Sequence, residues 1–257
     1  MKKDVGWIWD TCIKFIYDEE YPKALAEFLK ASKSNRILDA SCGIGFPAIG
    51  LRKQGFDIVC SDASTTMLKT FYRNCVKEGV RIESKRLFWN ELSENFKEEF
   101  DCVMCRGNSL PYVVSWENEK PDLSMAEKEI EEALKNFHAV LRKGGICYVD
   151  LSPREAYTPE QTHFVEEFAE KELNGKILGM VWNIRHDLVN KVRTWEPEII
   201  IRHKNSEVIE KAKVSYKAYH LRHSELISLM KKAGFRDICQ YVEIKGEKNY
   251  DIFIGCK

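Results

Sequence analysis

Residues 37–50, ILDASCGIGFPAIG, are the stretch on which the interpretation of the whole chain depends. Apolar residues lead to Asp39, a glycine-rich loop follows, and small residues then open a helix. Gly43, Gly45 and Ala48 match G-x-G-x-x-A, a pattern that follows the first strand of nucleotide-binding α/β domains. In dinucleotide sites, backbone N–H groups at such a helix start hold a pyrophosphate. Asp39 argues against a phosphate, because a carboxylate at the strand end repels one and suits a cationic ligand instead.

S-adenosylmethionine is a nucleoside ligand of that kind, since it carries an ammonium group and a sulfonium and no phosphate. Asp62 supports a nucleoside, because it ends the next apolar run about twenty residues later, where an acid can accept both ribose hydroxyls. The alternative is that Asp62, or Ser64, only caps the following helix. Phe88 and Trp89 follow the third predicted strand and can stack on an adenine, or they are core aromatics.

The charge balance excludes some classes of partner. The chain of 257 residues has 40 Lys and Arg and 40 Asp and Glu, so its net charge is zero. Such a chain lacks the overall positive charge typical of nucleic-acid or anionic-membrane binding, and we expect neither partner. Residues 1–25 do not resemble a secretory signal, and the nine cysteines lie mostly in apolar runs. These features predict a cytoplasmic protein with reduced cysteines and leave its oligomeric state open.

Strand-like and helical segments alternate through the first 151 residues. Short apolar runs are separated by amphipathic segments, a rhythm that predicts a doubly wound parallel sheet with right-handed crossovers. Ligands of such sheets bind at the carboxyl ends of the strands. The predicted strands are residues 36–40, 56–62, 81–87, 100–107 and 146–151, and the predicted helices are residues 46–55, 64–79 and 124–145.

The pattern changes after Leu151. Residues 152–173 predict a loop that leads into a helix, and residues 223–235 predict a helix capped by His223 or Ser224 and ended by Gly234. Three segments resemble antiparallel strands that cover one end of the parallel sheet, and two more resemble a closing hairpin. The three strands are residues 176–188, 191–204 and 207–222, and the hairpin joins residues 236–244 to residues 250–257.

The expected architecture is therefore a single α/β domain over residues 1–257. Its centre is a Rossmann-like, doubly wound, mostly parallel seven-stranded sheet with an antiparallel C-terminal hairpin. We expect residues 1–30 to form an N-terminal lid helix and residues 176–222 to form a small antiparallel β lid over the substrate.

Five stretches carry a resemblance to one enzyme family. With them the chain resembles the class I S-adenosylmethionine-dependent methyltransferases, and within these the glycine and sarcosine N-methyltransferases. The resemblance is strong over about residues 36–151 and loose elsewhere, and CRGNS is its most specific part. The stretches are RILDASCGIG (36–45), GFDIVCSDASTTMLK (55–69), FWNEL (88–92), FDCVMCRGNSLPYV (100–113) and LRKGGICYVDLSPR (141–154).

The resemblance implies that S-adenosylmethionine is the cofactor and assigns residues to its parts. The family's N-terminal arginine, which grips the cofactor carboxylate, has only Lys14 as a candidate counterpart here, and Phe88 stands where the family often has an asparagine. The implied contacts are Ser41 and Gly43 to the methionine part, Asp62 and Ala63 to the ribose, Met67 and Trp89 to the adenine, and a backbone contact from Arg106.

The expected substrate is a small-molecule amine such as glycine or sarcosine. The resemblance implies a substrate contact from Asn108, and it places Arg154 near an arginine that grips the substrate carboxylate. Side-chain oxygens that accept the amine N–H bonds would orient the lone pair. Trp9 either closes over the cofactor or packs on the sheet. The residues expected on the substrate side are Asn108, Tyr112, Arg154, Tyr157, Tyr216 and Tyr219, and those on the cofactor side are Trp9, Asp39, Ser41, Gly43, Gly45, Asp62, Ala63, Met67, Phe88, Trp89 and Arg106.

Three alternative functions stay open. The first is methyl transfer to oxygen, sulfur or nitrogen of another small metabolite, which needs the same fold and cofactor. The second is a nicotinamide-dependent oxidoreductase, which Asp39 disfavours. The third is a module that binds the cofactor without transferring methyl. No metal is expected, because Cys102 and Cys105 form a C-x-x-C without a second Cys or His pair nearby.

Overall fold

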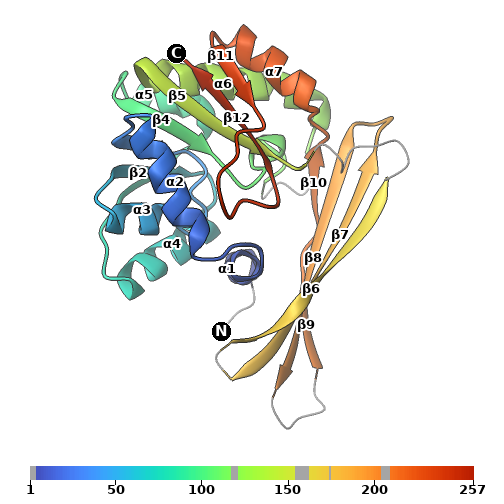
Figure 1. Cartoon of the computed structure of the whole chain (residues 1–257). Coiled ribbons are helices and arrows are strands. Elements are labelled where there is room, and N and C mark those ends of the chain that lie inside the picture. The colour runs from blue at the N-terminus through green and yellow to red at the C-terminus, as the bar shows by residue number, and fades with distance from the viewer. Residues whose placement is uncertain (1–3, 117–120, 154–161, 174, 204–208) are drawn as a thin grey trace.

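The computed structural model describes residues 4–116, 121–153, 162–173, 175–203 and 209–257 (Figure 1). Seven strands of this part form one sheet in the order β11-β12-β5-β4-β1-β2-β3. Strand β12 runs antiparallel to both neighbours, and the pairs from β5 to β3 are parallel. The predicted fold is confirmed. The strands are β1 Arg36–Asp39, β2 Asp57–Asp62, β3 Glu83–Arg86, β4 Phe100–Cys105, β5 Leu141–Leu151, β11 Arg236–Gln240 and β12 Asp251–Cys256.

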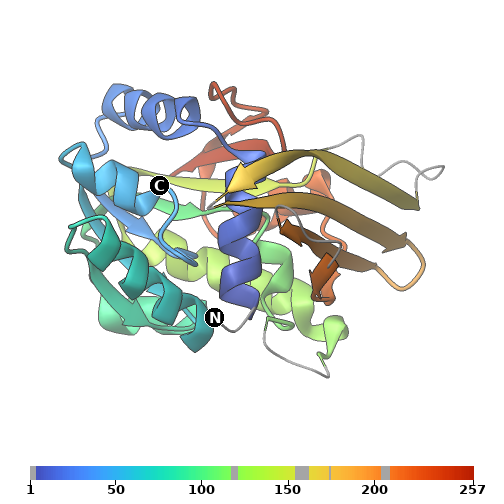
Figure 2. The same cartoon turned by 90° about the horizontal axis from the view of Figure 1, so that it is seen from below.

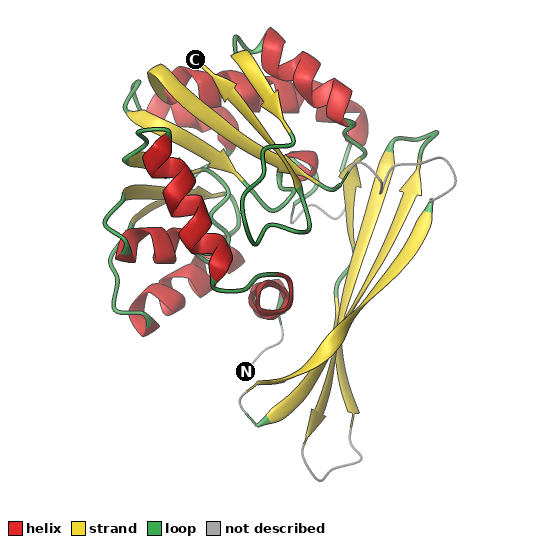
Figure 3. Cartoon of the chain, viewed as in Figure 1, coloured by secondary structure: helices red, strands yellow, loops and turns green. Residues whose placement is uncertain are grey.

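Helices cover both faces of this sheet (Figure 3), and strand alternation explains why. Successive side chains of a strand point to opposite faces. Ile37 of β1 therefore packs into a core with α1 to α4, whereas Leu38 packs into a core with α5 to α7. The helices are α1 Val5–Ile16, α2 Glu20–Ala31, α3 Ala48–Lys53, α4 Thr65–Lys77, α5 Leu92–Asn95, α6 Ala126–Val140 and α7 His223–Lys232, with 3-10 turns η1 Trp89–Glu91, η2 Leu110–Tyr112 and η3 Leu123–Met125.

A second, antiparallel sheet forms the lid. Figure 1 shows it beside the first sheet, with α1 between the two. It has the order β10-β8-β7-β6, and β9 also pairs with β8. Figure 2 shows α1 running across the base of the molecule next to this lid. The strands are β6 His163–Leu173, β7 Lys176–Asp187, β8 Val192–His203, β9 Ile209–Lys213 and β10 Tyr216–Tyr219.

Three predictions about this lid and the helix after it were wrong. Residues 163–173 are the strand β6 and not a helix, since they pair with β7. The third predicted strand is divided into β9 and β10, both of which pair with β8. The residue before α7 that serves as its N-cap is Arg222, with Glu225 accepting from its backbone N–H at 2.9 Å.

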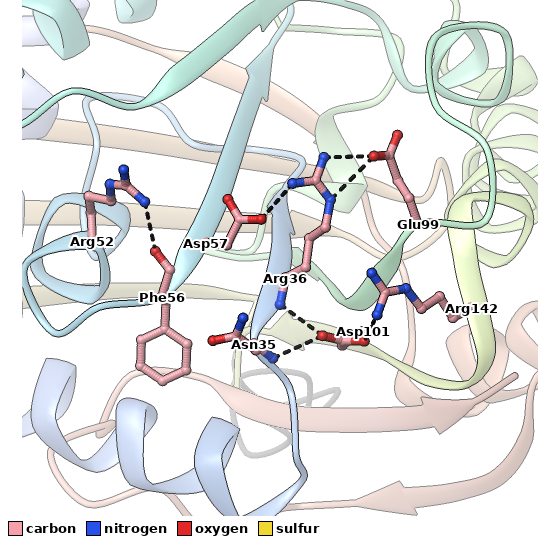
Figure 4. A network of polar contacts seen from close by, with 8 residues as sticks. All are labelled: Asn35, Arg36, Arg52, Phe56, Asp57, Glu99, Asp101 and Arg142. Atoms are coloured by element: carbon pink, nitrogen blue, oxygen red, sulfur yellow. Dashed lines mark hydrogen bonds and ion pairs between the residues drawn. The ribbon is translucent and has the colours of Figure 1, made fainter.

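The amino ends of the central strands are joined by a network of charges (Figure 4). Arg36 Nη1 lies 2.6 Å from Asp57 Oδ2, and Arg36 Nη2 lies 2.6 Å from Glu99 Oε2. Asp101 accepts from the backbone N–H of Arg36 at 2.8 Å and forms an ion pair with Arg142 at 3.0 Å. These contacts link β1, β2, β4 and β5 at the end of the sheet opposite to the expected ligand site.

Other sequence features have simple structural counterparts. All nine cysteines are free thiols, and Cys102 and Cys105 lie in the two different cores. Within the described residues, no group of three or more His, Cys, Asp or Glu side chains is placed to hold a metal ion. None of the described helices is both long and apolar enough to span a bilayer.

Candidate functional site

A cavity of about 370 Å³ lies at the carboxyl ends of β1 and β4, where the strand order reverses. This is the position at which doubly wound sheets bind ligands. Its walls come from the loops after β1, β2 and β4, from η1, η2 and α1, and from β7 and β8 of the lid. The sequence-predicted residues that line it are Trp9, Ser41, Gly43, Asp62, Ala63, Met67, Phe88, Trp89, Arg106, Asn108 and Tyr112.

The glycine loop after β1 uses its backbone N–H groups within the chain. Gly43 donates to Asp62 Oδ2 at 2.8 Å, and Ser41 donates to Asp39 Oδ1 at 3.3 Å. The N–H groups of residues 42 and 45 donate to backbone carbonyls at 3.1 and 2.8 Å. A phosphate site needs such N–H groups to point at the ligand. This loop therefore does not offer the cradle that a pyrophosphate requires.

Asp39 lies beneath this loop and not on the cavity wall. Its side chain is 1% exposed, and burial raises its pKa to about 7 although nearby Arg106 lowers it. The expectation that Asp39 faces the ligand is corrected, because the strand directs its side chain into the protein. Gly45 also lies off the wall, with a backbone φ of 99° that allows the loop to turn.

Asp62 does lie on the cavity wall, as expected, whereas Asp39 does not. The second oxygen of Asp62, Oδ1, accepts from the Ser64 backbone N–H at 2.8 Å, so the carboxylate is fixed from two sides. Ser64, and not Asp62, caps α4 by accepting from Met67 N–H at 3.0 Å. The carboxylate oxygens at the wall can accept hydrogen bonds from a vicinal diol. Ala63 and Met67 continue this wall.

The two aromatic residues after β3 occupy different environments. The Phe88 side chain is 54% exposed at the mouth of the cavity. Trp89 is held firmly, because its Nε1 donates to the Ala40 carbonyl at 2.6 Å and its ring meets Phe137 edge-on at 5.8 Å. Both line the cavity, and Phe88 is the more exposed of the two, whereas Trp89 is fixed by these contacts.

Helix α1 brings Trp9 over the glycine loop. The Trp9 ring meets Trp195 of the lid edge-on at 5.6 Å between centroids. A Cβ on Gly107 would lie 3.4 Å from the Trp9 ring, and one on Gly43 would lie 3.7 Å from its Nε1. Both glycines also have positive φ values, of 72° and 50°. Trp9 therefore both lines the cavity and packs against the core, so the structure has features of each of the two alternatives.

Arg106 is a buried cation at the inner end of the cavity. Its Nη2 donates to the Tyr17 hydroxyl at 3.3 Å and lies 3.8 Å from Glu247 Oε2. The guanidinium lies over the Tyr21 ring, 4.7 Å from its centroid. Burial raises the pKa of Glu247 to about 7, with a further rise from Asp150. Glu247 is therefore only partly ionised near neutral pH and does not fully balance the charge of Arg106.

Lys14 does not reach the cavity. Its Nζ pairs with Asp10 at 2.5 Å one turn away on the exposed side of α1. The candidate counterpart of the family's N-terminal arginine is therefore absent from the wall, and Arg106 is the cation that the structure places there instead.

Asn108 lines the cavity in an unexpected orientation. Its backbone has a φ of 55°, and its N–H donates to Asp150 Oδ1 at 2.7 Å. Its side-chain Oδ1 accepts from the Ser152 N–H at 3.0 Å, and its buried Nδ2 has no hydrogen-bond partner within the described residues. Asn108 was expected to accept from an amine; its oxygen already accepts one hydrogen bond, and the group without a partner among the described residues is its Nδ2 donor.

The predicted tyrosines separate into two groups. Tyr112 lines the cavity, whereas Tyr216 stacks behind Trp116 at 4.7 Å between ring centroids. Tyr219 is buried in the core on the α6 side and accepts from Lys191 Nζ at 2.9 Å. Tyr216 and Tyr219 are not brought to the wall, which corrects that part of the expected substrate side. The predictions for Arg154 and Tyr157 lie outside the described residues.

Several wall residues were missed. Arg193 is the clearest case, because it is a charged residue in the inward register of β8, which also carries Trp195, Ile199 and Ile201. A charged residue among the apolar residues on one face of a predicted strand is a signal that the sequence alone contains. Tyr17, Trp116, Trp182 and Tyr250 had no comparable signal, since aromatic residues are common in cores.

Comparison with known proteins agrees with this geometry. Residues 37–145 match a family model described as a methyltransferase domain. The chain is 31% identical over 122 residues to a glycine/sarcosine N-methyltransferase of Parasynechococcus marenigrum, a match that covers 48% of this chain and 39% of that protein. The match thus spans less than half of that relative's own length.

Solved structures match over the whole chain, lid included. DesVI of Streptomyces venezuelae has a TM-score of 0.77 at 14% identity and covers 99% of both chains. CalS10 of Micromonospora echinaspora, an amino pentose methyltransferase with bound cofactor, has a TM-score of 0.71 at 15% identity and covers 97% of this chain and 96% of its own. These comparisons confirm the predicted resemblance to methyltransferases, and the cofactor bound to CalS10 is the one that the resemblance implies.

Proposed function

We propose that this chain transfers a methyl group from S-adenosylmethionine to the amine nitrogen of a small molecule, with amino acids such as glycine and sarcosine as the first candidates. The observation that carries the proposal is the glycine loop, in which the N–H groups of residues 41, 42, 43 and 45 are bound within the chain while the Asp62 carboxylate stands at the cavity wall. Such a wall suits a nucleoside without phosphates. The names of the sequence relatives support an amino-acid acceptor.

The wall residues fit the parts of this cofactor. Asp62 would accept from the ribose hydroxyls, and Trp89 with the exposed Phe88 would flank the adenine. Arg106, the buried cation on this part of the wall, would hold the methionine carboxylate, and the Tyr17 hydroxyl would donate to it in place of Glu247 Oε2, to which it now donates at 2.9 Å. In that role Arg106 would exchange the weakly charged Glu247 for a carboxylate that is fully ionised.

When bound, S-adenosylmethionine supplies a methyl group that its positive sulfur already activates. The chain therefore needs to position the acceptor and to exclude water. Trp9 and the lid residues Trp182 and Trp195 form the apolar cover that does the second task. Aromatic faces also attract a cation, so the same rings favour the charge on the nitrogen as it gains a methyl group.

Asn108 and Tyr112 would fix the acceptor at the end of β4. The Asn108 Nδ2 and the Tyr112 hydroxyl would donate to the acceptor, while the Asn108 oxygen, which already accepts from the Ser152 N–H, keeps a second lone pair. An amine that reacts must be neutral, and a neutral fraction can be taken from solution without a protein base. The described wall residues thus account for orientation and cover without assigning proton removal to any of them.

A transfer assay with labelled S-adenosylmethionine tests the proposal. The acceptor panel should contain glycine, sarcosine, dimethylglycine, other amino acids, amino sugars and biogenic amines. We expect label in at least one amine and loss of transfer in Asp62→Ala. Binding of S-adenosylhomocysteine without transfer to any member would identify a cofactor-binding module instead, and transfer to oxygen or sulfur acceptors alone would overturn the amine assignment.

A further inference from the structure

Arg193 is a buried cation on the lid side of the cavity. It lies in the inward register of β8, opposite His186 of β7 and Ala218 of β10. Only 5% of the residue is exposed, yet it lines the cavity. Its Nη1 donates to the Tyr112 hydroxyl at 2.9 Å, and its Nε has no hydrogen-bond partner within the part of the chain that the structure describes.

No negative charge balances this guanidinium among the described residues. None of their carboxylates forms an ion pair with it, although two other arginines of the lid, Arg185 and Arg202, do have such pairs. The two buried histidines beside it, His186 and His220, have pKa values lowered by burial to about 3 and about 4, so they are neutral at physiological pH. A buried cation without a counter-charge is costly, which is the situation that an anionic ligand relieves.

Two further groups on the same wall are donors. Tyr112 accepts from Arg193, so its own O–H is left to donate towards the cavity. Asn108 binds Ser152 N–H through its oxygen, so its buried Nδ2 is a second unpaired donor. The carboxylates that line the cavity, Asp62, Glu91 and Glu129, belong to β2, η1 and α6. The cavity is thus acidic on the cofactor side and rich in donors on the lid side.

We propose that Arg193, supported by Tyr112 and Asn108, binds a carboxylate group of the methyl acceptor. This assignment deepens the proposed function and rests on it. A carboxylate fits better than a phosphate, because the described lid wall has one cation and neutral donors, which balance one negative charge and not two. The acceptor is then an amino acid or a related amino carboxylate held by the lid, and its carboxylate ties the lid to the substrate.

The assignment also accounts for the position of Trp116 and Trp195. Both line the cavity on the same side as Arg193. Tyr216 stacks on Trp116 at 4.7 Å and on Trp195 at 6.4 Å, so the three rings form one packed unit. An acceptor whose carboxylate lies on Arg193 would have its remaining atoms against these rings, which leaves room for a side chain larger than that of glycine.

Binding of matched acids and amides tests this role without requiring turnover. The probes are sarcosine with its amide and phenylacetate with phenylacetamide, together with methyl phosphate, titrated by calorimetry into the full chain with and without S-adenosylhomocysteine. We expect at least one acid to bind at least tenfold more tightly than its amide. Arg193→Gln should reduce that preference to less than twofold, and Arg193→Lys should retain part of it.

Arg185→Gln is the matched control. Arg185 lies on the neighbouring strand β7, is exposed, and pairs with Glu196 on the outer face. This variant should keep the acid preference. Affinity for S-adenosylhomocysteine should stay within twofold in all variants, and a thermal melt of each confirms folding.

The possible outcomes separate the two proposals. Equal binding of acids and amides by the unmodified chain, or a preference that survives Arg193→Gln, would overturn the role of Arg193. Preferential binding of methyl phosphate would replace the carboxylate by a phosphate. If S-adenosylhomocysteine itself gives no heat, the proposed function fails, while the titrations without it still decide whether Arg193 binds an acid.

Discussion

Polar side chains at the two ends of the central sheet differ in whether they have hydrogen-bond or ion-pair partners. At the amino ends of the strands, Arg36 has two carboxylates within 2.6 Å, and Asp101 is bound on both oxygens. At the carboxyl ends, Arg106 Nε and Asn108 Nδ2, both of residues that line the cavity, are buried without a hydrogen-bond partner within the described residues. Paired groups at one end stabilise the fold, and unpaired ones at the other are available to a ligand. The position of the site is thus readable from the distribution of unsatisfied groups.

Acid–base behaviour gives the largest expected difference between the two ends. The pKa of Glu247 is raised from 4.5 to about 7, and that of Asp39 from 3.8 to about 7, both mainly by burial. The folded chain therefore holds protons that the unfolded chain has lost, and the free energy of unfolding should fall as pH rises from about 4 to about 7. Each group corresponds to at most about 3 to 4 kcal/mol.

Urea unfolding between pH 4 and pH 8 measures this slope. Glu247→Gln should flatten it, because the amide cannot ionise, whereas Glu94→Gln at an exposed position should leave it unchanged. A slope that is the same in the unmodified chain and in Glu247→Gln would show that Glu247 titrates normally and that the inner end of the cavity is more hydrated than its burial indicates.

Strand β2 offers a matched pair of acids, one at each end. Asp62→Ala should weaken S-adenosylhomocysteine binding at least tenfold, about 1.4 kcal/mol or more, because the ribose acceptor and the bond to Gly43 are both lost. Asp57→Ala, at the other end of the same strand, should change affinity less than twofold. Calorimetry measures the affinity of the two variants for S-adenosylhomocysteine. Equal affinities would show that Asp62 does not bind the ribose.

The charge network at the amino ends should have the smallest effect, and on stability alone. Arg36→Met removes two partly exposed ion pairs, so we expect the free energy of unfolding to fall by about 1 kcal/mol while cofactor affinity is unchanged. Denaturant unfolding and calorimetry on the same preparation measure both quantities. A loss of cofactor affinity in this variant would mean that the two ends of the sheet are coupled.

The sequence predicts those parts of the fold whose hydrophobic periodicity can be recognised within a single strand or helix. Residues 36–151 alternate between short apolar runs and amphipathic helices, which identifies a parallel sheet. Strand β6 was missed because Phe164 and Phe168 are four residues apart, a spacing that places them on one face of either a helix or a strand. Long-range pairing with β7 decided the outcome, and a single sequence does not contain that information.

The site was predictable in its cofactor half and less so in its substrate half. Asp62 ends β2, and Gly43 and Trp89 lie within four residues of the ends of β1 and β3, so chain position alone brought them to the carboxyl edge. Arg193 reaches the cavity only because the lid folds back over that edge, which local sequence does not show. Asp39 was interpreted as facing the ligand because the sequence does not tell on which side of its loop the side chain lies.

Parallel calorimetric titrations with S-adenosylhomocysteine and with NAD⁺ test the central claim most directly, which is that this glycine loop serves a nucleoside without phosphates. We predict one S-adenosylhomocysteine bound per chain and no heat from NAD⁺. Binding of NAD⁺ without binding of S-adenosylhomocysteine would contradict the claim.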